Sequence, residues 1–306
     1  MNNIKMYAAP LEGLTGFAWR RAHKEVFGGA DKYYTPFLVA NQTHKFKTKE
    51  LRDLGQEEDN LVPQILTDKA EHFIWAAGQL KDMGYEEVNF NLGCPSGTVV
   101  SRGKGSGALK DIDNLDRMLD EIFNASLNIK ISIKTRIGFD DKEEFPSILG
   151  IYSKYPVHEL TIHPRLRSDF YKGEADRKVF LEALKDSKLT LVYNGDINSF
   201  DDEAFGYGCS VMAGRGLIAD PALFRKARGG ASANIDELMD FHERLIEYYS
   251  GYMQGDGPVI HHMKEMWTYF ENLFEYDEKT MKKLRKAKSL SEYRIAANAV
   301  MKGKMK

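Results

Sequence analysis

The chain has 306 residues, of which 42% are hydrophobic and 29% are charged, and its net charge at pH 7 is −2. This size allows one large core, and the near-neutral charge is unlike the basic balance of dedicated nucleic-acid binders. The chain has only two cysteines and no apolar run of about 18 residues, which excludes a disulfide framework and a membrane span. We therefore expect a reduced, cytoplasmic protein.

Eight apolar, β-rich runs recur in the first 213 residues, with helix-like stretches between them. The predicted strands are 4–11, 33–40, 61–66, 87–92, 129–135, 158–163, 190–194 and 209–213. Apolar residues at helical spacing predict helices over 69–83 and 174–186. Eight alternations of strand and helix favour an α/β fold, a (β/α)₈ TIM barrel. A doubly wound sheet fits less well, because no strand leads into a G-x-G-x-x-G turn.

A different pattern begins near residue 229. The segment 228–234 resembles a linker, and only helices are predicted after it, near 235–253, 258–274, 278–287 and 289–302. Residues 231–278 contain 2 basic and 11 acidic residues, whereas 279–306 contain 10 basic residues and one acidic residue, Glu292. We predict a barrel domain over 1–229 and a small all-helical domain over 230–306.

Polar residues stand where seven of the eight predicted strands end. They are Glu12, Gln64, Asn91, Lys134 with Arg136, His163 with Arg165, Asn194 with Asp196, and Arg215. In this fold the C-terminal ends of the strands carry the active site. Burying an unpaired polar group is costly, so a purely structural barrel has no reason to place them there. Each residue alone could be a solvated loop residue, but the set predicts a functional site.

The ends of the last two strands, NGDI (194–197) and AGRG (213–216), predict a phosphate site. Glycines let backbone N–H groups approach an anion, and Arg215 can fork onto phosphate oxygens. Turn and capping chemistry alone could explain the Asn-Gly-Asp run. A phosphorylated cofactor is implied, and Lys134 would stabilise negative charge on a ring such as a reduced flavin.

Cys94 follows the fourth predicted strand, within the segment NLGCPSGTVVSRGKGSG (91–107). A thiol of ordinary pKa, about 8.5, is protonated at neutral pH and can donate a proton. The following glycines suggest a lid, and the alternative is a buried small hydrophobe, as we expect for Cys209. His261 and His262 are adjacent and lack partners at ligand spacing, so no metal site is predicted.

Eight segments together resemble the tRNA-dihydrouridine synthase family. They are AAPLEGLTG (8–16), VPQI (62–65), NFNLGCPS (89–96), IKTRIG (133–138), TIHPRLRSDFYKGEAD (161–176), NGDI (194–197), GRG (214–216) and HHMKEMWTYF (261–270). They run in family order over nearly the whole chain. Leu11 stands where Met is usual, Pro164 where Gly or Ala is commoner, and the last segment matches loosely.

The resemblance implies bound FMN, NADPH as reductant, and reduction of the uracil C5–C6 double bond in tRNA. Cys94 would donate the proton to C5 while reduced FMN gives hydride to C6, and the expected catalytic residues are Cys94, Lys134 and His163. The implied FMN contacts are Pro10, Leu11, Glu12, Gln64, Lys134, His163, Asn194, Gly195, Asp196, Gly214 and Arg215. The implied substrate-side residues are Asn91, Arg136 and Arg165. The helical domain would hold tRNA, in a monomer without metal or membrane.

Three alternatives stay open at this point. The first is an FMN barrel acting on a small pyrimidine, in the manner of a dihydroorotate dehydrogenase, which does not account for the basic helical extension. The second is a dihydrouridine synthase that acts on ribosomal RNA. The third is a non-catalytic RNA-binding protein that has kept a flavin barrel.

Overall fold

A computed structural model describes residues 4–55 and 59–305. The chain divides into two compact units, each of which is described by itself. The first unit comprises the described parts of 1–10, 31–196 and 203–212. The second comprises 11–30, 197–202 and the described part of 213–306.

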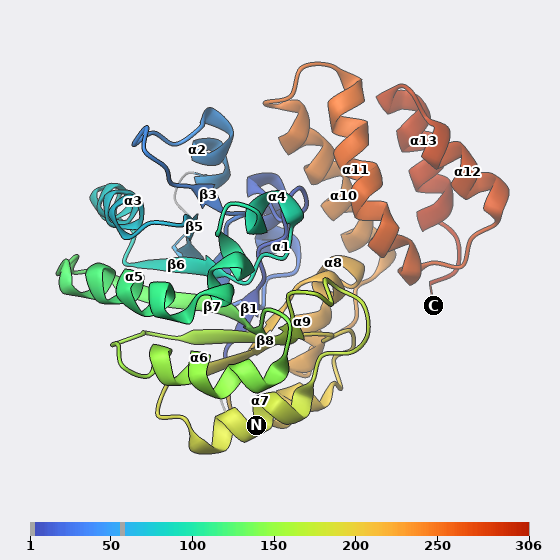
Figure 1. The fold of residues 1–306 in the computed structure, drawn as a ribbon. Coiled ribbons are helices and arrows are strands. Elements are labelled where there is room, and N and C mark those ends of the chain that lie inside the picture. The colour runs from blue at the N-terminus through green and yellow to red at the C-terminus, as the bar shows by residue number, and fades with distance from the viewer. Residues whose placement is uncertain (1–3, 56–58, 306) are drawn as a thin grey trace. The chain divides into compact units, whose positions relative to one another are not determined.

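Parallel strands form the centre of the first unit (Figure 1). They are β1 (Met6–Ala8), β2 (Lys32–Tyr34), β3 (Leu38–Val39), β4 (Leu61–Val62), β5 (Gln64–Leu66), β6 (Glu87–Leu92), β7 (Lys130–Gly138), β8 (Leu160–Leu166), β9 (Leu191–Asn194) and β10 (Ser210–Ala213). Their order in the sheet is β3-β5-β6-β7-β8-β9-β10-β1-β2-β4. The two ends of this order are joined, because β4 and β5 are separated only by Pro63 while β2 pairs with β4 and β3 with β5.

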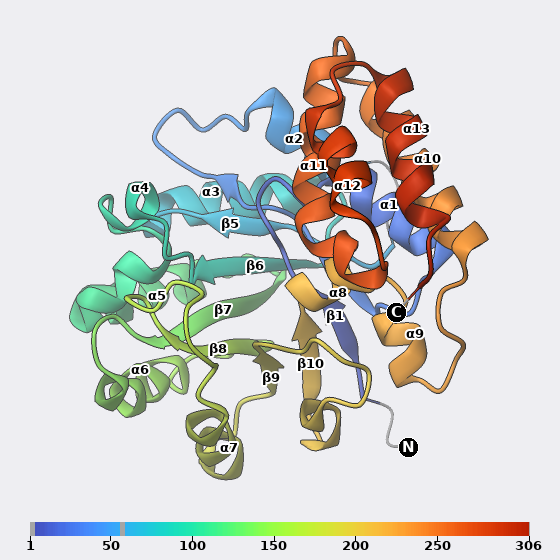
Figure 2. The same ribbon diagram turned by 90° about the vertical axis from the view of Figure 1, so that its right-hand side faces the viewer.

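The sheet therefore closes on itself, with β2 and β3 as one barrel position and β4 and β5 as another. Figure 2 shows the run of neighbouring strands from β5 to β10. This confirms the predicted (β/α)₈ barrel followed by helices. The predicted strand 61–66 is interrupted at Pro63, which has no N–H to donate to the ladder. The predicted strand 33–40 is likewise split, and the predicted strand 4–11 ends already at Ala8.

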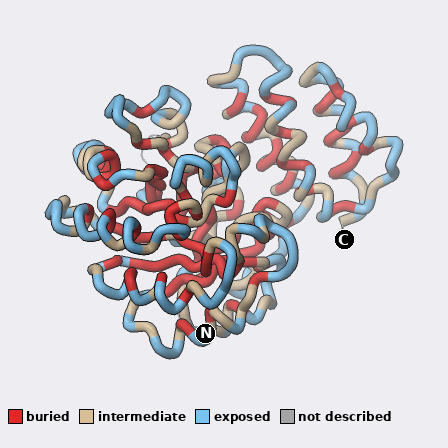
Figure 3. Tube along the Cα trace, viewed as in Figure 1, coloured by how far each residue is buried: buried red, intermediate tan, exposed pale blue. Residues whose placement is uncertain are grey.

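The barrel interior is packed with side chains, and its strands are buried almost throughout (Figure 3). A core cluster of Tyr7, Tyr34, Val62, Val192 and Met212, with Ala9, fills the centre. These residues come from different strands and alternate with residues that face the helices, as expected for a closed barrel. The barrel is thus a solid scaffold for whatever stands at its ends.

A buried ionic cluster lies near the N-terminal ends of β2, β6 and β8. Lys32 Nζ lies 2.6 Å from Glu87 Oε2 and 2.7 Å from Glu159 Oε2, and the Tyr7 hydroxyl donates to Glu159 Oε1 at 2.7 Å. His158 Nε2 lies 3.8 Å from Glu87. Two carboxylates and an imidazole could together hold a metal ion, but the Lys32 ammonium already forms an ion pair with each carboxylate.

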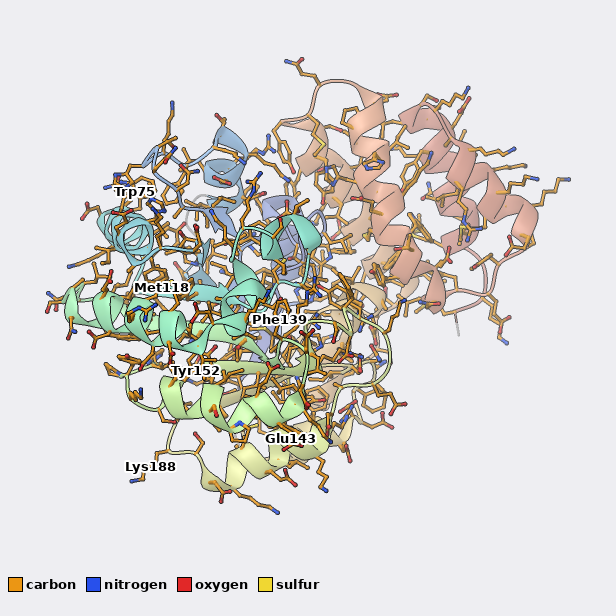
Figure 4. The ribbon with its side chains drawn as sticks, in the orientation of Figure 1. Trp75, Met118, Phe139, Glu143, Tyr152 and Lys188 are labelled. Carbon is orange, nitrogen blue, oxygen red and sulfur yellow. The ribbon has the colours of Figure 1, made fainter. Side chains whose placement is uncertain are left out.

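Helices and helical turns cover the outside of the barrel in the first unit (Figure 4, where Met118 and Tyr152 are labelled). They are α2 (Thr48–Leu54), α3 (Ala70–Asp82), α4 (Gly97–Val100), η1 (Gly105–Lys110), α5 (Ile112–Asn124), η2 (Lys142–Glu144), α6 (Phe145–Tyr152), α7 (Arg177–Asp186) and η3 (Glu203–Gly206). In α5 the buried residues are spaced by three and four positions, from Leu115 to Ile122, which gives one apolar face. Both helices predicted from apolar spacing are confirmed, as α3 and α7.

The second unit consists of helices. They are α1 (Phe17–Val26), α8 (Arg215–Ala219), α9 (Leu223–Ala227), α10 (Ile235–Ser250), α11 (Asp256–Phe270), η4 (Glu271–Leu273), α12 (Glu278–Lys286) and α13 (Leu290–Met301). The Phe27 ring after α1 packs edge-on against Phe241 of α10 at 5.4 Å, and Arg244 pairs with Glu25 at 2.9 Å. These contacts place α1 with the C-terminal helices, so the division into units differs from the predicted boundary at 229–230, which stays a prediction.

A hydrogen-bonded triad lies inside the C-terminal helices. Trp267 Nε1 donates to the Tyr293 hydroxyl at 2.7 Å, and that hydroxyl lies 2.8 Å from His242 Nε2. Burial lowers the pKa of His242 to about 3, so the imidazole is neutral and accepts the hydroxyl proton. The helices therefore share a satisfied polar core. Among the helices that the structure describes, none combines the length and the apolar character needed to cross a membrane.

Candidate active site

A row of polar side chains crosses the C-terminal half of the barrel interior. Gln64 Nε2 donates to Asn89 Oδ1 at 2.8 Å, and Asn89 Nδ2 donates to Ser132 Oγ at 2.9 Å. Asn91 Nδ2 donates to Gln64 Oε1 at 2.7 Å. All four residues are buried, and each amide is oriented by its neighbours. This network fixes the side chains of β5, β6 and β7 before any ligand arrives.

Asn91 also holds the loop that carries Cys94. Its Oδ1 accepts the backbone N–H of Gly93 at 3.1 Å and that of Cys94 at 2.9 Å. The carbonyl of Cys94 in turn accepts from the backbone N–H and the hydroxyl of Ser106, at 3.0 and 2.9 Å. The half-buried thiol is thus positioned on both sides by short hydrogen bonds. Asn91 was predicted to face the substrate, and this contact stays a prediction.

The glycines after Cys94 have a packing role in this structure. A Cβ on Gly105 would lie 2.7 Å from the carbonyl oxygen of Cys94, and one on Gly107 would lie 2.8 Å from that of Val100. Gly105 also has a φ of +56°, which side chains rarely adopt. The segment that was predicted to form a lid folds as α4 and η1. The glycines allow η1 to pack closely against the Cys94 loop.

Lys134 is the most unusual ion in this unit. It is half-buried in the middle of β7, opposite Asn91 near the C-terminal end of β6. Burial beside Arg136 lowers its pKa to about 7, while Cys94 acts in the opposite direction. No hydrogen bond or ion pair of Nζ is found within residues 4–55 and 59–305. Thr161 is opposite Lys134 in the register with β8, and its buried hydroxyl also has no partner in those residues. Two neighbouring polar groups that protein atoms leave unsatisfied indicate a ligand site.

His163, Arg165 and Asp196 form a chain of contacts at the ends of β8 and β9. Arg165 Nη1 donates to His163 Nε2 at 2.8 Å, and Arg165 Nη2 donates to Asp196 Oδ2 at 2.5 Å. A guanidinium only donates, so His163 Nε2 is the acceptor and the proton sits on Nδ1. Asp196 has a φ of +46° and also accepts the N–H of Ala175 at 2.9 Å. The roles predicted for these residues with cofactor or substrate are not tested by these contacts and stay predictions.

Arg136 is buried, and its donors are used on backbone carbonyls. Nε donates to Gly93 at 3.0 Å, Nη1 to Leu166 at 2.6 Å, and Nη2 to Phe170 at 2.5 Å. Burial lowers its pKa to about 10. Arg136 therefore ties the Cys94 loop to the loop after β8, and its predicted substrate contact stays a prediction. Tyr171, half exposed on that second loop, lies over Arg136 with the guanidinium 5.5 Å from its ring centre.

Three further predicted residues lie near the strand ends of the first unit. Pro10 is half-buried after β1, and Asn194 Nδ2 donates to the carbonyl of Met212 on β10 at 2.7 Å. A Cβ on Gly195 would lie 2.8 Å from Ala175 Cβ, so only glycine fits there. These contacts fix the ends of β9 and β10.

Four of the predicted cofactor residues belong to the second unit. Leu11 begins a tight turn in which its carbonyl accepts from the N–H groups of Leu14 and Thr15, and Glu12 is exposed on that turn. Gly214 is the residue before α8, and Arg215 is its first residue, half-buried. The neighbouring Gly216 is required by packing, because a Cβ there would lie 2.0 Å from the carbonyl oxygen of Ile197. A phosphate contact of Gly214 and Arg215 stays a prediction.

Several residues of the site were missed by the sequence analysis. Asn89, Ser132 and Thr161 alternate with hydrophobic residues on β6, β7 and β8, and period-two alternation was the signal that they face the barrel interior. Tyr171 stood in a segment that resembles the family, and an exposed aromatic residue beside buried arginines was the signal there. These residues complete the polar lining around Lys134 and the loops that flank it.

The chain is similar to known proteins over almost its whole length. The sequence model of the family described as Dihydrouridine synthase (Dus) matches residues 7–303. A "Probable tRNA-dihydrouridine synthase" of Staphylococcus epidermidis is 29% identical over 280 residues, which cover 86% of this chain and 82% of that protein. One of the same description from Helicobacter pylori is 28% identical over 283 residues, with 88% and 83% covered.

Solved structures agree in fold only. The structure described as "QR15, an Aldolase" aligns with a TM-score of 0.51 at 10% identity, covering 75% of this chain and 97% of that chain. At this identity the likeness concerns architecture and says nothing about chemistry. The reaction and the substrate are therefore indicated by the family and by the residues at the strand ends, and the fold alone does not indicate them.

Proposed function

The chain belongs to the dihydrouridine synthase family, and on that premise we propose that it reduces specific uridines of tRNA to 5,6-dihydrouridine. FMN is the bound cofactor and NADPH the reductant in this proposal. Both relatives are described as probable tRNA-dihydrouridine synthases, which supports tRNA as the substrate in preference to ribosomal RNA or a free pyrimidine. The observation that carries the proposal is the Cys94 loop, held by Asn91 close to an unpaired Lys134.

Cys94 is the proton donor in this scheme. When bound and reduced by NADPH, FMN would supply the hydride for C6 of the uracil. The Cys94 thiol would give its proton to C5, so that one hydride and one proton saturate the double bond. The thiolate left on Sγ is stabilised by the Lys134 ammonium, since the charges of these two groups interact. Solvent then restores the proton on Sγ. Asn91 keeps the thiol in place through the backbone N–H of Cys94.

The residues of the first unit fit a flavin. Lys134 Nζ and Thr161 Oγ1 are adjacent polar groups without a partner in the described chain, which suits an electron-rich ring with carbonyl oxygens. Gln64, Asn194 and neutral His163 stand on the neighbouring strands. We propose that these residues hold the ring. For Pro10, Leu11, Glu12, Gly195, Asp196, Gly214 and Arg215, contact with FMN is proposed from the family resemblance.

The substrate uridine must leave the RNA stack to be reduced. A base inside folded RNA is stacked and paired, so extrusion into a pocket is required. We propose that the helices over 230–306 hold the tRNA through basic residues of 279–305. Recognition of a folded RNA would then depend on shape and on phosphate contacts.

Two measurements test the proposal. Dihydrouridine is mapped in tRNA and ribosomal RNA from cells with and without the gene, and the loss of specific tRNA positions is expected. Purified protein is denatured and the released flavin identified, with FMN expected. An unchanged dihydrouridine map in tRNA would contradict the function, and release of FAD or of no flavin would contradict the cofactor.

A further inference from the structure

A groove of about 600 Å³ lies between α12 and α13 of the second unit. These two helices lie side by side in both ribbon views (Figures 1 and 2). One wall is the face of α12 that carries Lys279, Lys282, Lys283 and Lys286, and the other is the face of α13 that carries Ile295 and Ala299. The groove therefore combines a cationic wall with an apolar wall.

The four lysines of α12 are available to a ligand. No ion pair of their ammonium groups is found in the part of the chain that the structure describes. They recur at positions 279, 282, 283 and 286, and so span about 10 Å along the helix axis. Long side chains ending in nitrogen project outward from this helix (Figure 4). Four cations gathered on one face repel each other, and a bound anion would relieve that repulsion.

The neighbouring arginines have other partners. Arg285 Nη2 lies 3.0 Å from Glu271 Oε2, and Arg294 Nε donates to Glu243 Oε2 at 3.1 Å. The one carboxylate of the groove, Glu292, accepts the backbone N–H of Lys288 at 3.0 Å. The local cation surplus is thus carried by lysines alone.

The apolar wall is open to solvent. Ile295 is 70% exposed, more than the other exposed large hydrophobic residues of the described chain. Ala299 lies one turn further along α13, and the buried Ala296 also lines the groove, so the side chains beside Ile295 on this wall are short and apolar. A lone exposed isoleucine is ordinary, but one that faces four lysines across a groove suggests a ligand with both an apolar face and negative charges.

We propose that the α12–α13 groove holds one unstacked nucleotide of the RNA, with its base against Ile295 and Ala299 and its flanking phosphates on the four lysines. A nucleotide within an RNA strand has a flat, largely apolar base and a phosphate on either side. The base would then contact the apolar wall of the groove and the phosphates the cationic wall. Lysine is a point charge suited to phosphate, whereas planar carboxylates of an acidic peptide favour arginine forks, and the arginines here are engaged elsewhere. This inference rests on the proposed function, because it takes RNA as the substrate.

The test compares two RNA hairpins that differ only by one bulged nucleotide, bound to the full chain across a salt series. Ile295→Ala should weaken binding of the bulged hairpin roughly three- to tenfold, the effect of losing a few buried methylene groups, and leave the paired hairpin unchanged. Replacing the four lysines by Gln should weaken both hairpins. It should also reduce the slope of log affinity against log salt by about 0.7 for each phosphate that the variant no longer neutralises.

Matched controls separate this groove from general effects. Met83→Ala removes another exposed hydrophobic side chain, and Gln at Lys81, Lys130, Lys178 and Lys188 removes four exposed lysines of the first unit. Neither control should change the preference for the bulge. Ile295 is largely exposed and alanine is a good helix former, so the fold should be kept.

Three outcomes would overturn the inference. Equal affinities of wild type and Ile295→Ala for the bulged hairpin would remove the base contact. An unchanged salt slope in the lysine variant would remove the phosphate contacts. An acidic amphipathic peptide is also tested for binding and for competition with the hairpins. If its binding depends on Ile295 and it displaces neither hairpin, the groove would be assigned to a protein partner. In all three cases loss of dihydrouridine from tRNA in cells lacking the gene would still support the proposed function.

Discussion

Two lysines inside the same barrel have opposite surroundings. Near the N-terminal ends of the strands, Lys32 lies between Glu87 and Glu159, and these carboxylates raise its pKa despite burial. In the middle of β7, Lys134 has no ion pair within residues 4–55 and 59–305, and burial lowers its pKa to about 7. One ammonium is paired with carboxylates, and the other has no ion pair in the part of the chain that the structure describes.

The difference separates structural from functional charge. Lys32 pairs with both Glu87 and Glu159, so its own charge is compensated within the protein, although Glu87 Oε1 has no hydrogen-bond partner in the described chain. An unpaired ammonium costs stability and is retained where it serves a reaction. Lys134 is opposite Asn91, the penultimate residue of β6, and so lies towards the end at which barrels of this fold carry their active sites. Four predictions test this reading of the two ends.

The largest expected effect belongs to Cys94, at the end that carries Lys134. Cys94→Ala should lower uridine reduction roughly 10²–10⁴-fold, the usual worth of a positioned acid. Flavin content and NADPH oxidation should be unchanged, because the thiol acts on the uracil alone. Cys209→Ala is the control, and single-turnover assays on tRNA give the measurement. Normal turnover by Cys94→Ala would refute its role as proton donor.

The second effect concerns stability at the opposite end. Lys32→Met should lower the free energy of unfolding by about 3–5 kcal/mol, because two buried carboxylates lose their cation. Lys134→Met should leave stability at pH 7 the same or raise it, since it removes a desolvated charge without a partner. Urea denaturation of both variants measures the contrast.

Adding Glu159→Gln to Lys32→Met should restore part of the lost stability, because it removes one of the orphaned charges. Equal destabilisation by Lys32→Met and Lys134→Met would break the comparison between the two ends. In that case Lys134 would have a stabilising partner that the contacts do not reveal.

Most of the scaffold could be predicted from the sequence, because hydrophobic periodicity decides where strands and helices form. The places where it failed have local causes. Pro63 interrupts a run that reads as one strand, and it does so because it cannot donate to the ladder. The packing of α1 on α10 joins residues more than 200 positions apart, such as Glu25 and Arg244, and no local pattern reports such a contact.

The site was predictable by residue type and less so by role. Cys94 and Lys134 were both expected at strand ends. Cys94 does follow the end of β6, whereas β7 continues past Lys134 to Gly138, so Lys134 lies inside that strand. Arg136 and Arg165 were expected to face a substrate, and this contact stays a prediction. The structure adds that their donors bind loop carbonyls and Asp196. A sequence shows that a cation stands at a strand end. It does not show whether a distant loop folds back to accept its hydrogen bonds.

The third prediction concerns the support of Cys94. Asn91→Ala leaves two backbone N–H groups without their acceptor, which should cost about 1–3 kcal/mol of stability. It should also change the rate at which Cys94 is alkylated, because its loop is released. Asn89→Ala breaks the same polar network without touching that loop, and is the matched control. Cys209 interferes little, since burial raises its pKa to about 11.

Equal alkylation rates in wild type, Asn91→Ala and Asn89→Ala would show that Asn91 does not position the thiol. The proton-donor role of Cys94 would then have to depend on other contacts. The hydrogen bonds of Ser106 to the Cys94 carbonyl would be the next to remove, by Ser106→Ala.

The smallest effect is the pH dependence that Lys134 gives to stability. Its pKa is about 7 in the folded chain and 10.5 when unfolded, so between these values the unfolded state binds the extra proton. Folding stability should then rise with pH over this window, by at most about 1.4 kcal/mol per pH unit. Lys134→Met lacks this contribution, so the difference in unfolding free energy between wild type and variant should change with pH from 7 to 9.5.

The measurement is urea denaturation of flavin-free wild type, Lys134→Met and Lys32→Met at four pH values in that range. Lys32 has a raised pKa, so its contribution is already complete below 10.5 and its variant should differ from wild type by a constant. Added FMN should flatten the Lys134 slope, because the carbonyl oxygens of the flavin ring would stabilise the ammonium and move its pKa upward. A pH-independent difference for Lys134→Met would show that the ammonium is already neutralised without a ligand, and the contrast between the two ends of the barrel would fail.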